Sequence, residues 1–380
     1  MATAVPIIER RPQPAHDRIE RAWQTVRTVS RGYGYNGDEG KLETVFRTLT
    51  QSWNAFSPSA PLPWSGLGAD ASGCDVSMVL GGSERELRVT VEAQGCPASP
   101  WSYWDAARKL SEALEVNCGA DLTLLRRIED LFGPFAPEAA GVLWHGAVFR
   151  KDRAPWFKIY LHLMSAGRPR TRDFTQSILR RLGLSDVWPD VLARLNVDDE
   201  LLFLSFDLVP SEDARIKLYI RHANQTPAGL AQACSAGGVH HDREIESFVR
   251  ILLGEAGRSI HRGALTSLHL KRGQKVPVRA ATHVRLYPNC ALSDAVLFER
   301  MRQAIKHVGI APEQYEAVIS AMAGDDLDRQ QGIHGWASLQ WAEQDPVVTI
   351  YLSPRLHFAR YGPIGLDPSQ MWPSPLVDVC

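Results

Sequence analysis

The sequence lacks the features that mark several large classes of protein. Its 380 residues contain no run of about 18 apolar residues, which a membrane-spanning helix would need. The first residues include prolines and charges but no apolar core, so we expect no secretory signal peptide. The formal net charge is −1, which provides no bulk attraction for nucleic acid or an anionic membrane. We therefore expect small molecules as partners, and neither nucleic acid nor a membrane.

Motifs for redox chemistry, nucleotides and metals are also missing. The six cysteines include no CxxC pair, which favours reduced thiols over a disulfide framework, and we predict a cytoplasmic protein. The glycine-rich stretch at 66–73 matches neither the dinucleotide fingerprint nor the P-loop. No DDxxD motif offers paired carboxylates to a magnesium–diphosphate complex. We therefore predict no metal site.

What the sequence does contain is a repeated pattern of two strands followed by helices. Alternating polar and apolar residues predict hairpins at 75–95, 142–163, 200–221, 267–289 and 335–354. The second strand of each hairpin carries a short triplet: RVT at 88–90, KIY at 158–160, KLY at 217–219, RLY at 285–287 and TIY at 349–351. Apolar residues at helical spacing follow the first four hairpins, at 102–116, 171–183, 243–257 and 293–309.

We interpret this pattern as five units that stack on one another. A unit that cannot cover its own apolar face must bury that face against its neighbours. Ten antiparallel strands avoid exposed edges if they close into a barrel. The predicted fold is therefore α+β, a ten-stranded antiparallel β-barrel of five αββα-type repeats with an outer ring of helices. We expect a mobile N-terminal lead at 1–16, one barrel domain at 17–360 and a C-terminal tail at 361–380.

The polar face of these strands determines what the barrel could hold. One triplet alone is typical of a strand with its polar face in solvent, but five copies in register place that face inside the barrel. The inward side chains are then cationic and phenolic. The cations are Arg88, Lys158, Arg215, Lys217 and Arg285, and the phenols are Tyr160, Tyr219, Tyr287 and Tyr351. Such an interior must hold water, a ligand or both.

These two sets of side chains together indicate a particular chemistry. A cation and a unit negative charge at 4 Å attract by roughly 4 kcal/mol at an effective dielectric of 20, so several cations would stabilise a leaving diphosphate. Tyrosine faces attract cations by about 0.5–2 kcal/mol. A phosphate-binding protein needs only the first set. A site that generates an allylic carbocation beside diphosphate needs both sets and a shield against water.

The triplets, their order and the hairpin–helix period resemble the aromatic prenyltransferases of the dimethylallyltryptophan synthase family, specifically the shorter bacterial members. The resemblance covers roughly residues 60–355. It implies a ten-stranded barrel with a solvent-filled centre, and transfer of a prenyl group from dimethylallyl or geranyl diphosphate to an indole, commonly tryptophan, with no required metal or other cofactor.

The resemblance also implies roles for individual residues. Arg88, Lys158, Arg215 and Lys217 match the family's diphosphate ligands, and the four tyrosines match its shield around the allyl cation. Asp75, in GCDVS, takes the place of a carboxylate that binds the indole N–H, although the family usually has the longer Glu. His145, in LWHG, is the nearest counterpart of a lysine that accepts the ring proton.

Several positions depart from the family pattern or stay open. Arg285 stands where the family often has Gln, and Gln340 or Trp341 stands where a further arginine is expected. Trp144 and Trp156 could stack on the acceptor or could simply pack in the core.

The leading hypothesis is an indole prenyltransferase, monomeric or homodimeric, acting on tryptophan or a tryptophan-derived metabolite. Two alternatives remain: a non-catalytic barrel that binds an anionic aromatic ligand, and the same barrel prenylating a phenolic acceptor. The four phenols beside the cations argue against the first, because binding alone does not need them. Asp75 weakly favours an indole, because a carboxylate suits an N–H donor better than a phenolate.

Overall fold

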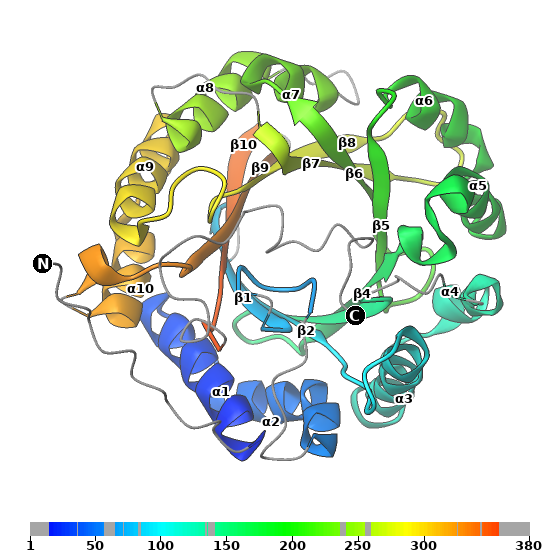
Figure 1. Cartoon of the computed structure of the whole chain (residues 1–380), viewed down its shortest axis with the longest axis horizontal. Coiled ribbons are helices and arrows are strands. Elements are labelled where there is room, and N and C mark those ends of the chain that lie inside the picture. The colour runs from blue at the N-terminus through cyan, green and yellow to red at the C-terminus, as the bar shows by residue number, and fades with distance from the viewer. Residues whose placement is uncertain are drawn as a thin grey trace, which may run out of the picture.

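Ten antiparallel strands form a closed barrel with helices on its outside (Figure 1). The computed structural model describes residues 15–356 except 36, 57–64, 71, 83–84, 134, 136–140, 236–240, 255–259, 325 and 343. The predicted fold is confirmed. Apart from residues 15 and 16, the predicted N-terminal lead lies outside the described residues, as does the whole C-terminal tail. We propose that residues 17–360 form one domain, as the sequence predicted.

The strands follow one another around the barrel in chain order, and β1 closes the ring by pairing with β10. Each hairpin predicted from the sequence supplies two neighbouring strands. The strands are β1 (Cys74–Gly81), β2 (Glu86–Glu92), β3 (Leu143–Phe149), β4 (Trp156–His162), β5 (Glu200–Asp207), β6 (Ile216–Gln225), β7 (Ile260–Leu270), β8 (Arg279–Arg285), β9 (His334–Ala342) and β10 (Asp345–Leu352).

Pairs of helices alternate with the hairpins and cover the outer face of the barrel (Figure 1). None of the described helices is both long and apolar enough to cross a membrane. The helices are α1 (Ala15–Gly32), α2 (Glu39–Leu49), α3 (Pro100–Cys118), α4 (Thr123–Arg126), α5 (Thr171–Arg181), α6 (Trp188–Ala193), α7 (Pro227–Ala233), α8 (Asp242–Leu253), α9 (Asp294–His307) and α10 (Glu313–Ala323).

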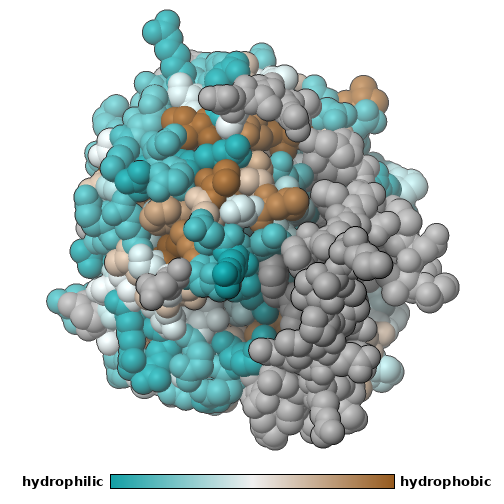
Figure 2. Space-filling model, turned by 60° about the vertical axis from the view of Figure 1, so that its left-hand side comes forward, coloured by the Kyte–Doolittle hydropathy of each residue, from teal (hydrophilic) through white to brown (hydrophobic). Residues whose placement is uncertain are grey.

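The main core lies between the barrel and the helices because alternate strand residues face outward. In β4, Ile159 and Leu161 are fully buried in this core, while Lys158 and Tyr160 face the interior. The helices turn their apolar faces inward in the same way. Figure 2 shows the side of the molecule where α9 and α10 lie, and hydrophilic residues dominate the coloured surface between small apolar areas. The amphipathic strands and helices therefore leave the barrel interior to the polar strand residues.

Local sequence signals fix the ends of the covering helices, as α3 illustrates. The Ser99 hydroxyl accepts a hydrogen bond from the Ser102 backbone N–H at 3.1 Å, and the Ser102 hydroxyl accepts one from the Ser99 backbone N–H. Pro100 occupies the first turn, where its missing N–H costs nothing. Gly119 ends the helix at φ 70°, a left-handed conformation that glycine adopts without strain. The face that α3 presents to the barrel includes Ser111, which contacts β3.

Candidate active site

One end of the barrel interior gathers the basic side chains of three hairpins. Arg88, Lys158 and Lys217 lie on β2, β4 and β6 and face the same space. Burial, followed by the charge of Arg88, lowers the pKa of Lys158 to about 7. Burial, followed by the charges of Lys158, Arg88 and Arg215, holds the pKa of Lys217 well below its ordinary value. These basic groups therefore oppose one another in the absence of an anion.

A glycine makes room for this cluster on the neighbouring strand. Gly146 of β3 pairs with Lys158, and a Cβ atom at position 146 would lie 2.9 Å from Lys158 Cγ. Any larger residue would push against the lysine stem. The lysine therefore lies across β3 only because position 146 carries no side chain.

Two carboxylates partly neutralise the cluster. Glu86 accepts a hydrogen bond from Arg88 Nε at 2.9 Å and also pairs with Arg150. Burial opposes the charge of Glu86, but Arg88 and Arg150 outweigh it and hold its pKa at about 2. Asp207 accepts a hydrogen bond from Arg215 Nε at 2.6 Å. The basic groups still outnumber these carboxylates, so the cluster is built for an additional anion.

Aromatic rings line the interior beside the cations. The centroids of Tyr160 and Tyr219 lie 6.0 Å apart, and Tyr219 lies 5.5 Å from His283, which in turn lies 6.3 Å from Tyr351. Lys158 Nζ lies 6.0 Å from the Tyr160 centroid. Burial raises the pKa of all three tyrosines, so the phenols stay neutral. Neutral rings around one space can stabilise a positive charge within it.

These rings border a cavity that also contains a carboxylate. Its lining includes Asp75, Trp144, Tyr160, Tyr219, His283 and Tyr351. The Asp75 side chain is buried, and its Oδ1 atom has no hydrogen-bond partner among the described residues. Burial raises the pKa of Asp75 to about 7. An N–H or O–H donor that entered the cavity would satisfy this oxygen and favour the charged carboxylate.

The two tryptophans predicted to bind the acceptor occupy different places. Trp144 lines the cavity, packs on Phe203 with centroids 4.6 Å apart, and donates a hydrogen bond from Nε1 to Glu92 at 3.1 Å. Trp156 lies instead at the cationic end, where the guanidinium carbons of Arg150 and Arg215 are 4.6 and 5.9 Å from its rings. Trp144 can therefore contact a ligand in the cavity, whereas Trp156 belongs to the cationic cluster.

The fourth triplet was assigned to the wrong residues. His283, not Tyr287, stands between Tyr219 and Tyr351. The position two residues earlier, which carries the cation in the second and third triplets, is Ala281. Arg285 is buried farther along β8, where burial and then the charge of Arg221 lower its pKa to about 10. The structure therefore does not place Arg285 in the cationic cluster formed by Arg88, Lys158 and Lys217.

Tyr287 follows the end of β8 and belongs to the main core outside the barrel interior. Burial and then the charge of Asp294 raise its pKa. It does not line the cavity, so the structure does not bring it together with the other three tyrosines.

His145, predicted to accept the ring proton, does not face the barrel interior. His145 pairs with Ile159, and both side chains lie on the outer face of the barrel. Its Nε2 atom lies 2.8 Å from the Ser111 hydroxyl of α3, and the residue is fully buried. The inward residues of β3 are Trp144, Gly146 and Val148, none of which is basic. β3 therefore places no basic side chain in the barrel interior.

Sequence reasoning missed several side chains that shape the site. Glu86 and Asp207 share the inward faces of Arg88 and Lys158, and strict alternation along β2 and the β4–β5 pairing would have identified them. His283 stands two residues before Arg285, on the same face of β8. Trp336 of β9, which also lines the cavity, follows from its pairing with Tyr351. Only the register between strands, which no single segment encodes, identifies these last two positions.

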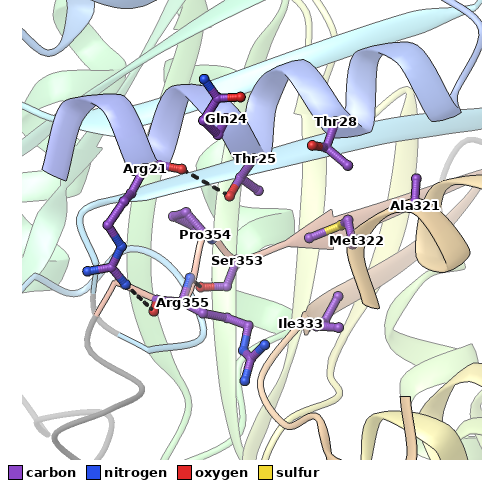
Figure 3. A pocket seen from close by; sticks show the side chains of 10 residues that line it. All are labelled: Arg21, Gln24, Thr25, Thr28, Ala321, Met322, Ile333, Ser353, Pro354 and Arg355. Carbon is purple, nitrogen blue, oxygen red and sulfur yellow. Dashed lines mark hydrogen bonds between the residues drawn. The ribbon is translucent and has the colours of Figure 1, made fainter. Parts of the chain in front are cut away.

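A second pocket lies away from this cavity and shares no residue with it. It is bounded by α1, α10 and the segment after β10, with Arg21, Thr25, Met322, Ser353 and Arg355 among its lining residues (Figure 3). Arg21 Nη2 donates a hydrogen bond to the Arg355 carbonyl at 3.5 Å. Its lining lacks the combination of aromatic rings and a buried carboxylate that distinguishes the cavity in the barrel. Among the described residues, no group of three or more His, Cys, Asp or Glu side chains is arranged to hold a metal ion.

Comparison with known proteins points to one family. The model of the family described as tryptophan dimethylallyltransferase matches residues 50–318. A solved structure titled 6-dimethylallyl tryptophan synthase is 25% identical, with a TM-score of 0.81 over 88% of this chain and 96% of that one. The 6-dimethylallyltryptophan synthase of Micromonospora olivasterospora, solved with DMASPP and Trp, is 24% identical, with a TM-score of 0.79 over 89% and 97%.

A third solved structure, the 5-dimethylallyltryptophan synthase of Streptomyces coelicolor, is 22% identical, with a TM-score of 0.79 over 90% of this chain and 98% of that one. The shared barrel therefore extends over nearly the whole of each solved chain.

Proposed function

This chain belongs to the tryptophan dimethylallyltransferase family and is a prenyltransferase, and we propose that it transfers a dimethylallyl group from its diphosphate to an indole. The acceptor is tryptophan or a tryptophan-derived metabolite. The observation that carries this proposal is the meeting of three features in one interior: a cationic cluster, a ring of neutral aromatics and a buried carboxylate. The Micromonospora relative was solved with Trp and DMASPP, which supports the same pair of substrates here.

The cationic cluster stabilises the leaving group. Arg88, Lys158, Arg215 and Lys217 bind the diphosphate, and its negative charge offsets the burial and the repulsion that together lower the pKa values of the two lysines. The allylic C–O bond breaks with its electron pair on the diphosphate oxygen. Because the cations are fixed on strands, they stabilise that charge with little reorganisation.

The aromatic ring protects the resulting carbocation. Tyr160, Tyr219 and Tyr351 present π-faces to the dimethylallyl cation and keep water away from it. Trp144 forms part of the wall on the acceptor side. A ring of this kind has no purpose in a barrel that only binds an anion, so it favours catalysis over simple binding.

Asp75 orients the acceptor. Its unpartnered oxygen accepts the indole N–H, and the negative charge increases the electron density of the ring. The indole then attacks the allyl cation, and a bond forms between the ring and the dimethylallyl carbon. Loss of a proton restores aromaticity. No metal ion is required for these steps.

A mass assay tests the proposal. The protein is incubated in EDTA with dimethylallyl diphosphate and, in separate reactions, L-tryptophan, an indole dipeptide or a phenolic acid. A mass gain of one prenyl unit on an indole supports the proposal, and a gain on the phenolic acid alone contradicts the indole assignment. An Asp75→Asn variant, which keeps the cationic cluster, serves as the matched control and should lose transfer to indole. Full activity only when magnesium replaces EDTA contradicts metal independence.

A further inference from the structure

Resting on the proposed function, we propose that His283 of β8 accepts the proton that the attacked carbon of the indole loses. The group predicted for this step, His145, lies on the outer face of the barrel, so the reaction needs another proton acceptor. His283 stands inside the ring of aromatics where the carbocation and the acceptor meet. The inference concerns only the last step of the reaction.

The position of His283 meets the geometric requirement. Its ring lines the cavity, 5.5 Å from the centroid of Tyr219 and 6.3 Å from that of Tyr351. These tyrosines belong to strands on either side of β8, so His283 completes the ring between them. An indole that reaches a cation held by the tyrosines must therefore come close to this imidazole.

The other groups that line the cavity do not suit the task. Of the lining residues, only Asp75 and His283 carry a carboxylate or an imidazole. Asp75 already binds the indole N–H, and a ring fixed through N–H cannot present a carbon proton to the same oxygen. The tyrosines remain protonated phenols because burial raises their pKa values. The imidazole is therefore the basic group left for the ring carbon.

Ser267 of β7 fixes the orientation of the imidazole. Its hydroxyl lies 3.0 Å from Nε2 of His283. When Nε2–H donates to this hydroxyl, Nδ1 carries the lone pair that can take a proton. Ser267 is fully buried, so solvent does not compete for this hydrogen bond.

The electrostatic surroundings keep His283 unprotonated until it is needed. Burial, followed by the charges of Lys217 and Arg88, lowers its pKa to about 3. A neutral imidazole does not repel the allyl cation. A weak base is sufficient, because the arenium ion formed by carbon attack is a very strong acid.

The proton step balances as follows. The C–H bond of the attacked carbon breaks, its electron pair returns to the indole π-system, and the proton forms a bond with Nδ1. Burial and then the charges of Lys217 and Arg88 disfavour the imidazolium, so it passes the proton to the departing diphosphate that these cations hold. His283 then returns to the neutral state and no other reactant is consumed.

Replacement of His283 by Tyr gives the sharpest test, because three other positions of the ring already carry Tyr. The turnover of wild type, His283→Tyr and His283→Phe is measured with L-tryptophan that carries either hydrogen or deuterium on its indole carbons. Binding of dimethylallyl thiolodiphosphate, measured by calorimetry, reports whether each variant keeps a folded cationic site. His145→Phe, on the outer face of the same barrel, is the control.

We expect kcat of both His283 variants to fall about 100-fold, since general bases contribute roughly that much or more. The KM for the donor and the affinity for the analogue should change less than about threefold. A deuterium isotope effect on kcat should appear in the variants and be absent in wild type, because proton loss becomes slow. Retained turnover in His283→Tyr, or reduced turnover without an isotope effect, would overturn the inference while leaving the proposed function intact. A wild type that transfers no prenyl group to any indole would overturn both.

Discussion

Replacement of Asp75 by Asn should stabilise the protein at alkaline pH while it abolishes transfer to indole. Burial raises the pKa of Asp75 from its ordinary 3.8 to about 7, so the folded protein holds a proton that the unfolded chain releases. Stability is therefore lost as pH rises through this window, and the loss is complete above about pH 7. The difference between the two pKa values corresponds to about 4 kcal/mol.

The Asn variant carries no titrating group at this position, so its advantage should depend on pH. Relative to wild type, we expect its pH-dependent gain in unfolding free energy to be about 1–2 kcal/mol at pH 5 and about 4 kcal/mol at pH 8. Any constant cost of burying the amide cancels in the comparison between the two pH values. Urea unfolding at both pH values measures the difference.

Asp105 of α3 provides the control, because its carboxylate lies on the helix surface, more than half exposed, where it pairs with Lys109. Asp105→Asn should shift stability equally at pH 5 and pH 8. If Asp75→Asn behaves in the same way, the carboxyl group is not titrating near pH 7 and the argument for a buried, unsatisfied acceptor in the cavity is refuted.

Other parts of the site give independent predictions. Lys158 has a pKa of about 7 without ligand, so the donor analogue should bind with proton uptake above pH 7 and lose affinity as the pH rises to 9. Calorimetry in two buffers of different ionisation enthalpy measures the proton uptake. Lys158→Met should remove it. Arg285→Gln should leave donor affinity within about twofold, and a tenfold loss would return Arg285 to the diphosphate site. His145→Phe should keep kcat within about twofold but lose about 1–2 kcal/mol of stability in urea unfolding, because the buried hydrogen bond between the imidazole and the Ser111 hydroxyl is lost and that hydroxyl keeps only the Ala107 carbonyl as a partner.

The architecture could be predicted from the sequence because the same pattern occurs five times. The second strand of each hairpin alternates polar and apolar residues around its triplet, and the helices between hairpins have one apolar face, so the closed barrel is the arrangement that covers every apolar face at once. The sequence also predicted that Lys158, Lys217 and Tyr160 face one interior space, because these residues occupy equivalent places in consecutive units.

The fourth unit shows where this reasoning stops. The RLY triplet at 285–287 resembles the others, yet the ring position falls four residues earlier, at His283. A shift of four residues keeps every side chain on the same face of a strand, so alternation cannot detect it. The pairing of Ser267 with Ala281 sets the register, and that pairing depends on a hairpin whose loop length is not fixed by the triplet.

His145 was a different kind of error, and the sequence did contain the signal. Trp144 and His145 are neighbours on one strand, so they point to opposite faces and cannot both contact the acceptor. Because Trp144 pairs with Tyr160, it faces inward, and His145 must face α3. The basic residue nearest in sequence to the family's lysine position therefore does not occupy that position, because its side chain points to the opposite face of the strand.

The central claim is that one chamber inside the barrel holds both the diphosphate and the indole. A crystal structure with dimethylallyl thiolodiphosphate and L-tryptophan tests this most directly. We predict diphosphate oxygens within hydrogen-bonding distance of Arg88, Lys158 and Lys217, the dimethylallyl group between Tyr160 and Tyr351, and the indole N–H on Asp75. A diphosphate bound beside Arg21 and Arg355 in the second pocket (Figure 3), with no ligand inside the barrel, would contradict the account.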